Sequence, residues 1–145
     1  MKNSLLVLEG IRKSFGARHI LDITRFELAA GESYVLTGEN GSGKTTLLRV
    51  LAGLDDAEVG ACRYEGRPFD LHTYPKWLRH DVIYVHQHPY LFRSSIVDNI
   101  SYGLKARGMA ASACEPLVRD AIAWAGVGDL LDVPPHSLSG GEKQR

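Results

Sequence analysis

The stretch that most constrains the fold is residues 38–46, GENGSGKTT, which fits the spacing G-x-x-x-x-G-K-[ST]. The apolar run before it, residues 33–37, is typical of a parallel strand buried on both faces. The run after it, residues 47–54, carries leucines at positions 47, 51 and 54, as one face of a helix does. Gly53 stands where such a helix would stop. The sequence therefore predicts a strand, a glycine loop and a helix in succession.

This order of elements places backbone N–H groups and a helix N-terminus around one point, which attracts phosphate. Glycine permits the loop dihedrals and the close approaches that a Cβ would obstruct. Lys44 would carry its charge to the β- and γ-phosphates, and the Thr45 hydroxyl would ligate Mg²⁺. An ordinary turn rich in glycine and serine is the alternative, but the flanking runs favour a nucleotide site. Its predicted members are Gly38, Asn40, Gly41, Ser42, Gly43, Lys44, Thr45 and Thr46.

Composition limits the other classes of function. The chain has 145 residues, about one domain, and 17 basic residues balance 17 acidic ones, so no excess charge favours a nucleic-acid partner. Cys62 and Cys114 lack metal-ligand spacing and are expected to be reduced thiols of a cytosolic protein. No signal peptide and no apolar run as long as a membrane span is visible. Any membrane role is therefore expected to be peripheral.

The remaining pattern predicts a mixed α/β part followed by a helical part. Two strands, residues 4–15 and 19–30, would join at Gly16-Ala17, and Ala30-Gly31-Glu32 would make the next turn. The helix predicted at residues 114–125 would carry Leu117, Ala121 and Trp124 on one face. The other predicted elements are strands at 61–64 and 82–86, a loop containing Gly66 and Pro68, and helices at 95–107 and 114–125. We predict domain boundaries that divide the chain into residues 1–88, 89–137 and 138–145.

A second motif, LSGGEKQR, occupies residues 138–145. A serine and two glycines that open a polar helix form another anion-binding helix N-terminus, although a simple helix cap is the commoner use of this pattern. The motif resembles the signature of ABC-type ATPases, the nucleotide-binding subunits of ABC transporters. The order of Phe15, the glycine loop, Gln87, a helical segment and the signature is similar to that family over the whole chain.

The resemblance implies an α/β fold: a P-loop NTPase core with an N-terminal antiparallel β subdomain and an α-helical subdomain. Residues 38–46 would be the Walker A loop, with Thr46 near the α-phosphate. Phe15 would stack on adenine, whereas a core aromatic is the alternative. Gln87 would contact Mg²⁺ and the attacking water, so Gln87 and Lys44 are the expected catalytic residues, and Thr45 and Gln87 the metal ligands.

The resemblance also implies ATP and Mg²⁺ as ligands and two protein partners. Ser139, Gly140 and Gly141 would close over the ATP of a second ATP-binding subunit in a head-to-tail dimer. A transmembrane permease subunit would be contacted through apolar residues, with Tyr90, Leu91 and Phe92 as candidates. The expected function is to couple ATP binding and hydrolysis to solute transport, from the cytoplasmic face of the cell membrane.

Several alternatives remain open. Residues 135–137 and 102–108 resemble importer subunits, whereas residues 91–100 have features of exporters, and we expect an importer. A non-transport ABC ATPase and a catalytically silent nucleotide-binding fragment are the other hypotheses. In the family, the Walker B aspartate, the glutamate base and the switch histidine follow the signature. This sequence ends at Arg145, so the C-terminal part of the fold is expected to be missing, and the chain is expected to bind ATP at best, with negligible turnover.

Two departures from the family pattern concern single side chains. His86 stands before Gln87 where the family usually has phenylalanine. Together with His88 it could bind a metal, although a third ligand is lacking, or it could simply be tolerated at a strand end. Glu39 brings an acidic side chain near the phosphates in the glycine loop, where it would cost little if it points outward.

Overall fold

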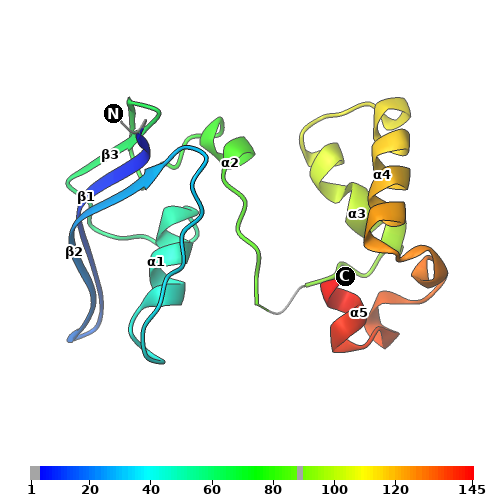
Figure 1. Cartoon of the computed structure of the whole chain (residues 1–145), viewed down its shortest axis with the longest axis horizontal. Coiled ribbons are helices and arrows are strands. Elements are labelled where there is room, and N and C mark those ends of the chain that lie inside the picture. The colour runs from blue at the N-terminus through cyan, green and yellow to red at the C-terminus, as the bar shows by residue number, and fades with distance from the viewer. Residues whose placement is uncertain (1–3, 88–89) are drawn as a thin grey trace. The chain divides into compact units, whose positions relative to one another are not determined.

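The computed structural model describes residues 4–87 and 90–145, and the chain divides into two compact units, residues 1–84 and 85–145 (Figure 1). Each unit has its own cluster of buried apolar side chains. The domain boundary predicted after residue 88 lies outside the described residues. No helix in the described ranges is both long and apolar enough to cross a membrane.

The first unit is built on a four-stranded antiparallel sheet with the order β2-β1-β3-β4. β1 (Ser4–Phe15) and β2 (Arg18–Ala29) form a long hairpin around the two-residue turn Gly16-Ala17, which confirms the prediction. β3 (Ala61–Tyr64) is also confirmed. β4 (Arg67–Phe69) replaces part of the loop predicted around Gly66 and Pro68. A proline is acceptable there because β4 is an edge strand, which does not need every backbone N–H for pairing.

Helix α1 (Lys44–Leu51) packs its apolar face against this sheet. Leu47 and Val50 are buried, and they share the core with Leu8 and Ile11 of β1. The predicted stripe was partly wrong, because Leu54 is exposed and lies beyond the helix end. The helix stops at Leu51, and the chain turns through a glycine at residue 53 with φ of 66°. The proposed role of that glycine as a helix stop is confirmed.

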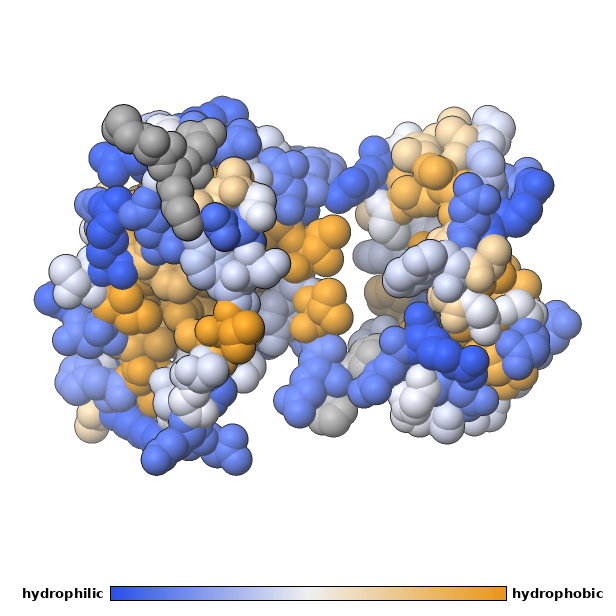
Figure 2. All heavy atoms as spheres, in the orientation of Figure 1, coloured by the Kyte–Doolittle hydropathy of each residue, from blue (hydrophilic) through white to orange (hydrophobic). Residues whose placement is uncertain are grey.

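The two strands predicted at residues 33–37 and 82–86 were wrong, since the structure assigns neither run to a strand. Val35 is 87% exposed and Ile83 is 75% exposed. A parallel strand depends on hydrogen bonds from neighbouring strands, and every ladder among the described residues is antiparallel and excludes both runs. A short helix that the sequence did not predict, α2 (Leu78–Asp81), precedes the second run. Figure 2 shows hydrophobic side chains open on the surface of this unit.

The second unit is helical. The helices predicted at 95–107 and 114–125 are confirmed as α3 (Ile96–Ala106) and α4 (Ala111–Ala125), with α4 beginning three residues earlier. Ser95 caps α3, because its hydroxyl accepts a hydrogen bond from the Asp98 backbone N–H at 3.0 Å. The last elements are the 3-10 turns η1 (Gly128–Leu130) and η2 (Pro135–Ser137) and the helix α5 (Gly140–Gln144).

The buried face of α4 differs from the predicted one. Cys114 and Val118 are buried, whereas Leu117 is 46% exposed and Trp124 is 89% exposed. Two stripes of apolar side chains run along this helix, one through Cys114 and Val118 and the other through Leu117 and Trp124. They lie on neighbouring faces of the helix. Helical periodicity identifies both stripes but does not decide which one meets the rest of the unit.

Cys62 and Cys114 are both buried and both free. Burial is the main cause that raises the pKa of the Cys62 thiol, and the Asp70 carboxylate adds to it. A buried thiol with a raised pKa forms little thiolate, so Cys62 is a structural residue and a poor nucleophile.

Candidate nucleotide-binding site

The glycine loop sits against the start of β2. Gly43, the N-cap of α1, has φ of 90° and ψ of 3°, in the left-handed region. A Cβ at Gly43 would lie 3.0 Å from the carbonyl oxygen of Ile20 and 3.0 Å from Cδ2 of Leu21. Both its conformation and its surroundings therefore require glycine. The preceding residues, 38–42, are all exposed, so the loop presents its backbone to solvent.

The Lys44 side chain folds back across this loop. Its Nζ donates to the carbonyl oxygens of Gly38 and Glu39, both at 2.7 Å, and lies 3.5 Å from the Ser42 hydroxyl. An ammonium group has three donors and phosphate oxygens are stronger acceptors than carbonyls, so Lys44 can exchange these contacts for an anion.

The first turn of α1 is open to an anion. Gly43 provides no side-chain cap, and the first turn contains no acidic residue. The N–H groups of a first turn have no acceptor inside the helix, so they are available to phosphate oxygens. Thr45 is exposed in this turn and Thr46 is half-buried. The Thr45 hydroxyl is an oxygen ligand of the kind that Mg²⁺ prefers, so the residues present fit this ion.

Phe15 ends β1 at the tip of the hairpin, and it is 56% exposed. This exposure argues against the alternative that Phe15 is a core aromatic. The Lys13 ammonium lies 5.2 Å from the centre of the ring and also donates to the carbonyl of Asp56. Phe15 thus offers an accessible aromatic face in the same unit as the glycine loop.

An ion pair fixes the other end of α1. The Arg49 guanidinium donates two hydrogen bonds to the Asp55 carboxylate, at 2.8 and 2.9 Å. The hydrogen bond from Arg49 is the largest cause that holds the pKa of Asp55 below its ordinary value. A carboxyl whose pKa is depressed by folding stabilises the fold above its unfolded pKa and loses that contribution as the pH falls through its folded pKa.

We therefore expect acid to destabilise the parent chain more than an Asp55→Asn chain, as the pH falls below the ordinary aspartate pKa of about 4. The measurement is the melting temperature of both chains between pH 6 and pH 3. Asp22→Asn is the matched control, because Asp22 is exposed and lies 3.6 Å from Arg12 in a surface pair of little energetic weight. If the melting temperatures of the parent and Asp55→Asn fell by the same amount between pH 6 and pH 3, the stabilising role of the Arg49–Asp55 pair would be contradicted.

The signature segment forms a capped helix, α5, in the second unit. The Ser139 hydroxyl accepts a hydrogen bond from the Glu142 backbone N–H at 3.3 Å, and the Glu142 carboxylate accepts one from the Ser139 backbone N–H at 2.7 Å. These bonds to Ser139 hold the pKa of Glu142 below its ordinary value. Gly140 and Gly141 are the first two residues of the helix. The helix cap is thus the observed use of Ser139.

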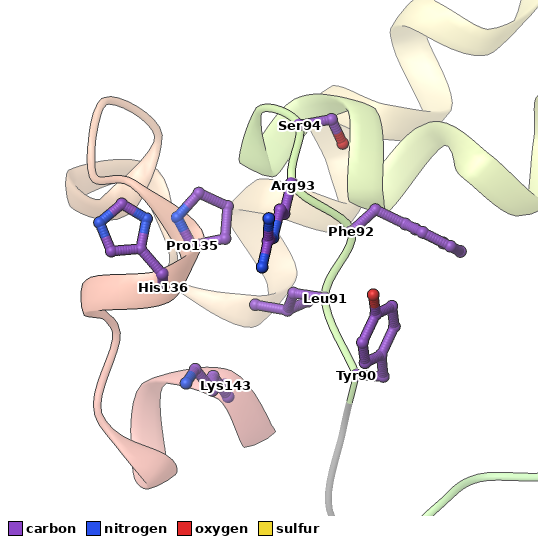
Figure 3. Close-up of a pocket in the computed structure, with 8 residues that line it drawn as sticks. All are labelled: Tyr90, Leu91, Phe92, Arg93, Ser94, Pro135, His136 and Lys143. Atoms are coloured by element: carbon purple, nitrogen blue, oxygen red, sulfur yellow. The ribbon is translucent and has the colours of Figure 1, made fainter.

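A pocket of about 680 Å³ in the second unit lies beside α5 (Figure 3). Arg93, His136 and Lys143 give it three basic side chains. Figure 3 shows Phe92 directed away from Pro135 and His136, on the other side of the chain from Arg93. The pocket is lined by Tyr90, Leu91, Phe92, Arg93, Ser94, Pro135, His136 and Lys143. The three apolar residues expected to meet a permease therefore gather around one pocket.

Gln87 is exposed at a bend of the second unit. In the described ranges, no group of three or more His, Cys, Asp or Glu side chains could hold a metal. His88, the second imidazole of the possible metal pair, lies outside those ranges. The described residues therefore offer no third ligand for a metal bound by His86 and His88.

Sequence reasoning missed one side chain beside the glycine loop, that of Arg18. Its Nη2 atom lies 3.8 Å from the position that a Cβ on Gly41 would occupy. The available signal was the two-residue turn, since it places Arg18 directly opposite Phe15 across the hairpin.

Comparison with known proteins identifies the class of this chain. A sequence profile described as "ABC transporter" matches residues 21–145, most of the chain. The chain therefore belongs to the ABC transporter family, and the resemblance inferred from the glycine loop and the signature is confirmed.

The individual relatives are ATP-binding proteins of import systems. The chain is 36% identical over 142 residues to the molybdate/tungstate import ATP-binding protein WtpC of Thermococcus kodakarensis, a match that covers 97% of this chain and 42% of the relative. It is 31% identical over 140 residues to the tungstate uptake system ATP-binding protein TupC of Peptoclostridium acidaminophilum, covering 97% of this chain and 63% of the relative. The chain thus spans less than two thirds of the length of these relatives.

A solved structure confirms the fold class. The chain matches CbiO1 of Clostridium perfringens, described as part of the ABC transporter complex cbiONQ, with a TM-score of 0.78 and 26% identity. The match covers 99% of this chain and 59% of that structure. The predicted α/β P-loop fold with an antiparallel β part and a helical part is therefore confirmed.

Proposed function

We propose that this chain is the ATP-binding part of a subunit that couples ATP binding and hydrolysis to the import of a solute across a membrane. One observation carries the proposal. The glycine loop, with the Lys44 ammonium across it, lies in the same compact unit as the exposed ring of Phe15. A cationic loop and an open aromatic face are the two features that a nucleotide requires. The import systems of the relatives support the direction of transport.

The proposed chemistry is phosphoryl transfer to water, in which the protein mainly positions groups and stabilises charge. Lys44 and the backbone N–H groups at the start of α1 hold the phosphates. Thr45 and Gln87 are the proposed ligands of Mg²⁺, which would neutralise charge on the phosphate oxygens. Gln87 also has the proposed role of orienting the attacking water.

The proposed partners are a second ATP-binding subunit and a transmembrane permease. Ser139, Gly140 and Gly141 would contact the nucleotide of the second subunit, and their place at the exposed start of α5 supports this role. Tyr90 and Phe92, which are 76% and 42% exposed, are the proposed permease contacts. The protein would then sit at the cytoplasmic face of the membrane as a peripheral subunit.

The test is the affinity for ATP of the parent chain and a Phe15→Ala chain, measured by isothermal titration calorimetry. Loss of base stacking is worth about 1–3 kcal/mol, so we expect the affinity to fall about tenfold. Phe15→Trp keeps an aromatic face and should bind ATP at least as tightly as the parent.

Two outcomes would count against the proposal. A parent chain that does not bind ATP would remove the nucleotide site altogether. Equal affinities for the parent and Phe15→Ala would leave a phosphate site without recognition of the base.

A further inference from the structure

Arg18 is the first residue of β2, and its guanidinium lies beside the glycine loop. The pairing of β2 with β1 is irregular at Ile20, between the pairs Lys13–Leu21 and Ser14–His19, so the contacts with the loop and not simple alternation locate these side chains. Ile20 packs against Gly43, where a Cβ would meet its carbonyl oxygen at 3.0 Å and its Cγ2 at 3.2 Å. Arg18 reaches the same loop two residues earlier, at Gly41, with Nη2 3.8 Å from the Cβ position. Two contacts therefore place the start of β2, residues 18–20, against the loop.

His19 separates these two residues in sequence and lies on the opposite face. Its Nδ1 is 2.9 Å from the hydroxyl of Ser14 on β1. The hairpin therefore sends only one of its two consecutive basic side chains to the loop.

The charge of Arg18 is not compensated. Arg12, Arg25 and Arg49 of the same unit each pair with a carboxylate. Among the described residues, the guanidinium of Arg18 makes no hydrogen bond or ion pair. A free guanidinium beside a row of backbone N–H groups adds positive potential at the point where an anion would bind.

We propose that Arg18 is a phosphate-binding residue, which contacts the polyphosphate chain of the nucleotide from the side opposite α1. This inference rests on the proposed function and extends it, since neither the family motifs nor the sequence analysis assigns a role to Arg18. The hairpin then contributes both halves of recognition. Phe15 meets the base, and Arg18, its partner across the two-residue turn, meets the phosphates.

The experiment compares binding of two probes, ATP and inorganic tripolyphosphate, to the parent chain and three variants. Tripolyphosphate has the charge of the phosphate chain but no base. We expect Arg18→Ala to weaken both probes by the same factor, about tenfold, as the loss of a charge-assisted hydrogen bond does. Arg18→Lys keeps the charge but not the fork of donors, so a smaller loss is expected.

Arg12→Ala is the matched control, because it removes one exposed positive charge from the same hairpin. It should leave both affinities within about twofold of the parent, since solvent and salt screen a charge that does not touch the ligand. Melting temperatures without ligand check that each variant folds, which is expected because Arg18 is exposed.

The outcomes separate this inference from the proposed function. A parent chain that binds ATP, with Arg18→Ala equal to Arg12→Ala, would overturn the role of Arg18 alone. A loss for ATP without a loss for tripolyphosphate would also overturn it, because Arg18 would then contact the nucleoside. A parent chain that binds neither probe would overturn the proposed function and this inference together.

Discussion

A Lys44→Ala chain is expected to melt at the same temperature with and without Mg²⁺-ATP, whereas the parent chain is stabilised by the nucleotide. Ligand at one hundred times its dissociation constant adds about 2.7 kcal/mol to the free energy of unfolding when only the folded state binds. Without the ammonium at Gly38 and Glu39, the loop loses the charge that would meet the phosphates. The measurement is a thermal melt over a range of ATP concentrations, with and without Mg²⁺.

Lys76→Ala is the control, because Lys76 is an exposed lysine of the same unit that lies outside the proposed site. It should keep the full stabilisation by ATP. If ATP stabilised the Lys44→Ala chain as much as the parent, the assignment of the loop as the phosphate site would be wrong. If ATP stabilised neither chain, the proposed function would fail.

A Gly53→Ala substitution is expected to cost the fold about 2–4 kcal/mol. Gly53 has φ of 66°, and a Cβ there would lie 2.2 Å from Cδ2 and 2.3 Å from Cγ of the Tyr74 ring. The ring has no room to retreat, because Tyr74 is only 3% exposed and its hydroxyl donates to the Leu51 carbonyl at 2.9 Å. Overpacking of this kind costs about 1–3 kcal/mol, and the left-handed backbone adds about 1 kcal/mol.

Gly66→Ala separates the two causes. Gly66 has φ of 78°, but no atom lies within 4 Å of a Cβ placed there, so only the backbone cost of about 1 kcal/mol is expected. Urea unfolding of the parent and both variants gives the comparison. Equal losses for Gly53→Ala and Gly66→Ala would show that the Tyr74 ring moves aside freely.

The hydroxyl of Tyr74 also stays protonated over the whole working range of pH. Burial raises the pKa of Tyr74 to about 12. The hydrogen bond to the Leu51 carbonyl therefore persists, and it ties the end of α1 to the segment that follows the sheet.

Features that depend on neighbouring residues could be predicted from the sequence. The β1–β2 hairpin follows from alternation around a two-residue turn, and the cap of α5 follows from Ser139 and Glu142 at the spacing of a capping box. The glycine loop before α1 follows from its motif. In each case, the residues that decide the structure lie within a few positions of one another.

Features that depend on distant partners could not be predicted in the same way. An apolar run such as 33–37 becomes a strand only when another strand pairs with it, and its composition does not provide that partner. The buried face of α4 was predicted wrongly for the same reason, because Leu117 and Cys114 lie on two different apolar stripes and only the packing of the unit decides which one is buried. Arg18 was missed because its role depends on the packing of β2 against the loop.

The Lys44 contacts have a consequence for the thermodynamics of ligand capture. The ammonium bridges two loop carbonyls, so the loop already holds a defined shape before any anion arrives. A ligand then exchanges one set of polar partners for another and does not have to order a disordered segment. Because ordering a flexible loop consumes part of the binding energy, a preorganised loop leaves more of that energy to appear as affinity. Lys44 thus holds the loop in shape before binding, and the same ammonium group would then contact the phosphates.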